Sequence, residues 1–117
     1  MSELLQLQQQ FAKDVAQLIA YAAVLGYGVT LGEAWRTPEQ AQWNAEHGKG
    51  VAHSLHEERL AIDLNLFKDG QYLTEAEAYR ALGEWWKKLS PAHCWGGDFH
   101  GLVDLDHYSI TPDGVHK

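Results

Sequence analysis

The stretch LAIDLNLF, residues 60–67, alternates more regularly than any other part of the chain. Ile62, Leu64 and Leu66 would share one face of a strand, because successive side chains of a strand point to opposite sides. Asp63 would lie on the other face, with Asn65. The pattern predicts a strand with one face in the core. Asp63 is then a carboxylate held still on the outer face of a rigid element.

Three helices are predicted around this strand. The first covers residues 2–25, with Ser2 as its cap and apolar side chains every three or four positions. The second begins at Thr37-Pro38 and runs to about His47, because Thr as N-cap followed by Pro is a strong start signal. The third opens with the capping box Thr74–Glu77 and ends before Pro91.

The remaining segments predict two more strands and the connections between elements. Residues 28–35 are rich in strand formers, and residues 107–110 predict a final strand. Residues 48–58 are expected to form a loop, residues 68–70 a turn and residues 95–99 a glycine-rich turn. The expected fold class is α+β, with about three helices packed on one small antiparallel sheet.

Length and composition point to one domain, residues 1–117. The chain is 45% hydrophobic and carries a formal charge of −7, with Lys and Arg scattered, so we expect no nucleic acid as a partner. No apolar run is long enough for a membrane span, and no leader is evident, so we expect no membrane insertion and cytoplasmic synthesis. The single Cys94 permits no internal disulfide. We expect a monomer.

Seven histidines among many acids suggest a metal site. His56 and Asp63 lie seven residues apart, and a third ligand must come from far along the chain, where His107 is best placed. The helical motif His-Glu-x-x-His is absent, because Leu60 stands where its second His would be. We expect the other histidines to be surface or hydrogen-bonded residues: His47, His53, His93, His100 and His116.

Four motifs together resemble the LAS zinc peptidases. SLHEERLAID (54–63) resembles the signature Ser-x-His-x-x-Gly-x-Ala-x-Asp, and DLDH (104–107) resembles Asp/Glu-x-x-His. AWRT (34–37), followed by Gln40, is similar to Gly-x-Arg-Thr/Ser, and WGGDF (95–99) to Trp-Gly-Gly-Asp-Trp/Phe. The order and spacing of all four match, over roughly residues 28–110. Arg59 and Ala34 stand where the family has Gly.

The resemblance implies a role for each site residue. One zinc ion would be held by His56, Asp63 and His107, with Asp104 as the general base and Asp106 as a competing candidate. Because Asp104 and His107 are three apart, the chain must turn or bulge between them. The further expected roles concern substrate: Arg36 stabilising the oxyanion or clamping a carboxylate, Ser54 and Gln40 binding the substrate backbone, and Trp95 and Asp98 either lining the cleft or bracing the site.

The resemblance also implies a fold and a function. The fold would be that of hedgehog and D-alanyl-D-alanine peptidase domains, with the zinc in a cleft on the sheet. The protein would cut the peptidoglycan stem peptide, most concretely as a phage endolysin that cleaves the L-alanyl-D-glutamate bond and acts on the wall after release, with no separate cell-wall-binding domain. Two alternatives stay open: a D-alanyl-D-alanine carboxypeptidase or dipeptidase, and a non-catalytic zinc-stabilised binding module.

Overall fold

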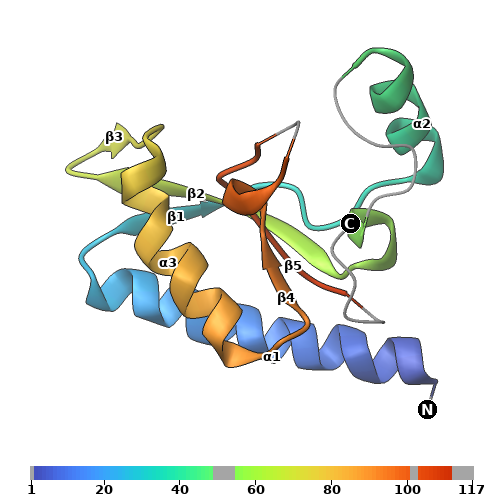
Figure 1. The fold of residues 1–117 in the computed structure, drawn as a ribbon, viewed down its shortest axis with the longest axis horizontal. Helices are drawn as coiled ribbons and strands as arrows, with labels where there is room; N and C mark the ends of the chain where they lie inside the picture. The colour runs from blue at the N-terminus through green and yellow to red at the C-terminus, as the bar shows by residue number, and fades with distance from the viewer. Residues whose placement is uncertain (1, 49–54, 101–102, 112–117) are drawn as a thin grey trace.

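The computed structural model describes residues 2–48, 55–100 and 103–111. It confirms the α+β class, with helices and antiparallel strands in one chain (Figure 1). The helices are α1 (Glu3–Val24), α2 (Pro38–Glu46) and α3 (Ala76–Leu89), with the short 3-10 helices η1 (Leu55–Glu58) and η2 (Gly96–Asp98). The strands are β1 (Gly28–Leu31), β2 (Ala61–Lys68), β3 (Gln71–Tyr72), β4 (His93–Trp95) and β5 (His107–Ile110).

The predicted central strand is β2, and it organises the sheet. The strand order is β1-β2-β5-β4, with β3 paired to the end of β2, and every pairing is antiparallel. In the register between β2 and β5, Ile62 faces Tyr108 and Asp63 faces His107. Each strand therefore contributes one core residue and one polar residue at neighbouring positions.

Helices α1 and α3 pack together and supply the helical side of the core. Ser2 caps α1 as predicted, because its hydroxyl accepts a hydrogen bond from the backbone N–H of Leu5 at 3.1 Å. Leu18 of α1 and Trp86 of α3 are fully buried, together with Leu64 and Leu66 of β2. The core thus lies between these helices and the face of β2 that the alternation predicts, which leaves Asp63 on the opposite face.

A buried contact between a histidine and a carboxyl group joins α1 to β4 within this core. His93 is 2% exposed, and its Nε2 lies 2.9 Å from Asp14 Oδ2 while its Nδ1 lies 2.7 Å from the carbonyl oxygen of Trp86. Both ring nitrogens therefore have a polar partner inside the core. His93 is therefore a hydrogen-bonded structural residue, as expected.

Two local predictions differ from the structure, and two short strands were not predicted. The strand predicted over residues 28–35 ends at Leu31, although Gly32 and Glu33 continue its hydrogen bonds to Asp63. Helix α3 begins at Ala76 with Glu75 as N-cap and without a side-chain cap hydrogen bond, so the predicted capping box at Thr74 does not form. The short strands β3 and β4 were not predicted at all.

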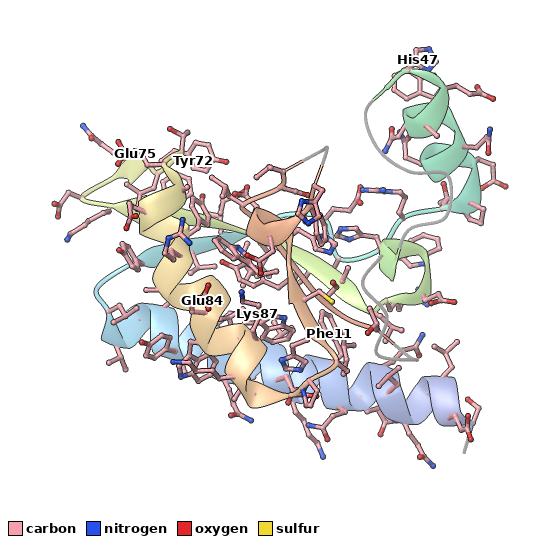
Figure 2. All side chains as sticks on the ribbon, viewed as in Figure 1. Phe11, His47, Tyr72, Glu75, Glu84 and Lys87 are labelled. Carbon is pink, nitrogen blue, oxygen red and sulfur yellow. The ribbon has the colours of Figure 1, made fainter. Side chains whose placement is uncertain are left out.

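The second helix stands to one side of the sheet. Figure 1 shows α2 apart from the layer formed by α1 and α3, and Figure 2 shows His47 at its far end. Its N-terminus is as predicted, because the Thr37 hydroxyl accepts from the backbone N–H of Gln40 at 3.0 Å. Within the described ranges, none of the helices is both long and apolar enough to cross a membrane.

Candidate metal centre

His56, Asp63 and His107 come together from three separate elements. Asp63 lies in β2, His107 opens β5 and His56 lies in η1. One possible ligand atom from each lies within 4.8 Å of the others. His56 Nε2 lies 3.4 Å from Asp63 Oδ1, and His107 Nδ1 lies 3.8 Å from the same oxygen.

These three residues fit one metal ion. Bonds of about 2.0–2.2 Å in a tetrahedral arrangement place neighbouring ligand atoms about 3.3 Å apart, close to the separations found here. His56 is 2% and His107 is 7% exposed, so both imidazoles are screened from water. Asp63 Oδ1 is buried and accepts no hydrogen bond from any group in the described part of the chain. A buried carboxylate oxygen in this position suits a cation.

The backbone around Asp63 is fixed on both sides. Its N–H donates to the carbonyl of Glu33 at 2.9 Å, and its carbonyl accepts from the N–H of Gly32 at 2.7 Å. On the other side, the N–H of the next residue, Leu64, donates to the carbonyl of Asp106 at 2.9 Å. The backbone that carries the Asp63 carboxylate is therefore restrained by hydrogen bonds on both sides.

A tight turn connects Asp104 to His107, as the spacing requires. The N–H of His107 donates to the Asp104 carbonyl at 3.2 Å, and the N–H of Asp104 donates to the Gly96 carbonyl at 3.0 Å. A Cβ at Gly96 would overlap the Asp104 carbonyl and come 2.7 Å from the Cβ of His107. Glycine is thus needed at residue 96 for β4 and η2 to approach the turn.

The two candidate bases have different surroundings. Although Asp104 is an exposed residue, partial burial of its carboxyl group, followed by the negative charges of Asp63 and Asp106, raises the pKa of Asp104 to about 6. Asp106 instead accepts a hydrogen bond from the hydroxyl of Tyr72 on β3 at 3.1 Å. Asp104 is therefore the carboxyl group that interacts with both Asp63 and His56, while Asp106 is tied to a neighbouring strand.

Arg36 lies beside the same cluster. Its backbone N–H donates to the carbonyl of His56 at 3.2 Å, and its guanidinium contacts the carboxylate of Glu33. Burial and the positive charges of His56 and Arg36 lower the pKa of His107 to about 4, partly offset by Asp63. Glu33 was not predicted from the sequence, where the only signal was an acid three residues before Arg36.

The residues expected to bind substrate lie in different elements of the fold. Trp95 is 2% exposed and its indole N–H donates to the carbonyl of Leu105 at 2.9 Å, so of its two expected roles the structure favours bracing the site. Asp98 lies 2.5 Å from Lys87 Nζ, on α3 (Figure 2). Gln40 lies on α2 and donates to Asn44. Ser54 lies outside the described residues.

A surface hollow of about 390 Å³ lies on α2 and not at the metal cluster. It is lined by Thr37, Glu39, Gln40 and Trp43. Trp43 is 43% exposed. Gln40 therefore faces this hollow beside α2.

Arg59 occupies a conformation that favours glycine. Its φ is 58°, in the left-handed region, and its guanidinium lies 5.0 Å from the centre of the Trp35 ring. This is the position where the LAS signature has Gly. A left-handed conformation at this position would account for the glycine of the signature, and in this chain Arg59 adopts it.

The residues of this cluster lie within the range that a family model matches. A family model described as D-alanyl-D-alanine carboxypeptidase matches residues 47–110, more than half of the chain and including all three metal-site residues. The chain belongs to this family. The resemblance to the LAS zinc peptidases is thereby confirmed, and so is the expectation of an enzyme.

Two solved structures share the fold. An L-Ala D-Glu endopeptidase from Serratia marcescens, ChiX, is 18% identical with a TM-score of 0.72, over 88% of this chain and 79% of its own. The vancomycin-resistance D,D-pentapeptidase VanY, as a Glu-to-Ala mutant in complex with Zn(II), is 20% identical with a TM-score of 0.58, over 86% of this chain and 70% of its own. Among curated proteins no match is found.

Proposed function

We propose that this member of the family is a zinc-dependent peptidase that cleaves the L-alanyl-D-glutamate bond of the peptidoglycan stem peptide, in the manner of a phage endolysin. The observation that carries the proposal is the cluster of His56, Asp63 and His107 with Asp104 beside it. The structure with the higher TM-score of the two described, over the larger share of both chains, is named as an L-Ala D-Glu endopeptidase. As an endolysin, the protein would be made in the cytoplasm and reach the wall after release.

Each residue of the site has a role in the proposed hydrolysis. His56, Asp63 and His107 would hold the zinc ion, which would supply Lewis acidity for the scissile carbonyl and for the attacking water. Asp104 takes the proton of the attacking water and returns it to the leaving amine. In the metal-free protein the pKa of Asp104 is raised to about 6, and a bound cation would lower it, so Asp104 would be ionised and able to accept the proton.

Arg36 supplies the positive charge beside the reacting carbonyl. Its side chain is 13% exposed and its backbone is tied to that of His56, so the guanidinium keeps its place relative to the metal. A planar, permanently charged group there stabilises the developing oxyanion or clamps a substrate carboxylate. Asp106 serves a structural role in this proposal through its hydrogen bond with Tyr72.

A D-alanyl-D-alanine carboxypeptidase is the second candidate, and the description of the matched family favours it. Both reactions use the same metal and the same base. They differ only in which amide of the stem peptide reaches the zinc.

Digestion of purified peptidoglycan by the zinc-loaded protein separates the two candidates. New N-terminal D-Glu, identified by mass spectrometry, supports the endopeptidase, while released D-Ala supports the carboxypeptidase. The matched control is Asp104→Ala, which we expect to retain zinc and to lose cleavage. An absence of new termini with a zinc-loaded wild-type sample would overturn the proposal that this chain cleaves peptidoglycan.

A further inference from the structure

The carboxylate of Glu33 lies between two residues of the site. Its Oε1 contacts the Arg36 guanidinium and lies 3.7 Å from His56 Nδ1. The opposite nitrogen of the same ring, Nε2, is the one that faces Asp63 Oδ1 at 3.4 Å. Glu33 therefore lies behind His56, on the side of the ring away from the metal cluster.

The position of Glu33 is fixed by the sheet rather than by its side chain. Its backbone carbonyl accepts the hydrogen bond from Asp63, so the main chain of Glu33 is attached directly to that of a metal-site residue. Its side chain is 33% exposed, while that of His56 is 3% exposed. A change of side chain at residue 33 can therefore alter the charge behind His56 and leave the backbone pairing in place.

We propose that Glu33 is a positioning residue that directs His56 and Arg36 toward the metal. This inference rests on the proposed metal site. At 3.7 Å the Glu33 oxygen is beyond direct hydrogen-bond distance from Nδ1, so it acts on the ring through its charge, which favours a proton on the far nitrogen and leaves the near nitrogen to bind the metal. The same carboxylate offsets the positive charge of Arg36, which would otherwise repel a divalent cation beside it.

The test compares zinc affinity in wild type, Glu33→Gln and Glu77→Gln by competition with a chelator. Glu77 is the matched control, because it is an exposed acid on α3 in an ion pair with Arg80. We expect Glu33→Gln to bind zinc about 10–100-fold more weakly, the usual effect of losing the partner of a metal-binding histidine. Glu77→Gln should bind as wild type does.

A second readout separates positioning from folding. The unfolding temperatures of the metal-free wild type and Glu33→Gln should agree, while the visible spectra of their cobalt-loaded forms should differ, because cobalt absorption reports the geometry of its ligands. Affinity within twofold of wild type together with an unchanged cobalt spectrum would overturn the role of Glu33. If wild type itself binds zinc no better than His56→Ala, the proposed metal site fails instead.

Discussion

Asp63 and His107 lie directly opposite each other on β2 and β5, so two metal-site residues are one cross-strand pair. Facing residues of antiparallel strands put their Cβ atoms about 4.5–5.5 Å apart on the same face, which brings two side chains within reach of a shared ion. The next pair, Ile62 and Tyr108, points into the core. The packing that fixes the register of the sheet therefore also fixes the geometry of the site.

Replacing Gly96 should damage the site through the backbone. In Gly96→Ala the new Cβ overlaps the Asp104 carbonyl, so the turn to His107 must move. We expect a loss of stability of about 1–3 kcal/mol, as for overpacking elsewhere, with weaker zinc binding. Urea unfolding and a zinc titration measure both. Gly28→Ala is the control, because a Cβ there meets Phe67 at an ordinary 3.8 Å. Wild-type zinc affinity in Gly96→Ala would contradict the argument.

Asp104 should make the metal-free protein less stable as pH rises. Its pKa is about 6 in the fold and about 4 when unfolded, so between these values the unfolded state binds fewer protons and stability falls with increasing pH. Asp104→Asn removes this loss. The unfolding temperature of the variant relative to wild type should therefore increase from pH 4 to pH 7.

His107 does not obscure that comparison. The lowered pKa of His107, about 4, has the opposite effect on stability. The unfolded imidazole gains a proton first, so the fold loses stability as pH falls from about 6.5 toward 4. This contribution is present in both proteins and cancels in their difference. A pH-independent difference in unfolding temperature between Asp104→Asn and wild type would refute the interpretation of Asp104.

The cost of the left-handed conformation at residue 59 can be measured by comparing two variants of Arg59. Arg59→Gly and Arg59→Ala both remove the contact with Trp35, but only glycine adopts a φ of 58° without steric cost. We expect the glycine variant to be more stable than the alanine variant by about 1 kcal/mol. Chemical denaturation of the two proteins gives the difference directly. Equal stabilities would show that this turn changes conformation once Arg59 is gone.

The buried pair of Asp14 and His93 should stabilise the fold without affecting the metal site. Asp14→Ala leaves the buried Nε2 of His93 without its hydrogen-bond partner, which costs about 1–3 kcal/mol. Asp14→Asn keeps an acceptor and should cost less. Both variants should bind zinc as wild type does, because the pair lies in the core between α1 and β4. An Asp14→Ala protein as stable as wild type would contradict a stabilising role for the contact between Asp14 and His93.

Much of this architecture could be predicted because its signals are local. The alternation in residues 60–67 identifies β2 and the side on which Asp63 lies, and the three-residue spacing of Asp104 and His107 correctly requires a turn. The start of α3 could not be predicted in this way. The hydroxyl of Tyr79 donates to the carbonyl of Leu73 and accepts from the N–H of Leu66, so tertiary contacts hold the chain that leads into the helix.

The missed parts depend on distant neighbours. Strands β3 and β4 have two and three residues, too few to show a period, and exist because β2 and β5 offer partners. Glu33 resembles any surface acid in the sequence, and only the pairing of its backbone with Asp63 places it behind His56. Arg59 was recognised as a departure from the family's glycine, but its left-handed conformation required the structure.

Zinc binding by the three predicted ligands is the most direct test of the account. In a calorimetric titration of metal-free protein we expect wild type to bind one zinc ion per chain. At a free zinc concentration one hundred times the Kd, binding should raise the free energy of unfolding by about 2.7 kcal/mol. Asp63→Ala and His107→Ala should lose this site while Glu77→Gln retains it. Full-affinity binding of one zinc by both ligand variants would contradict the central claim that His56, Asp63 and His107 form the metal centre.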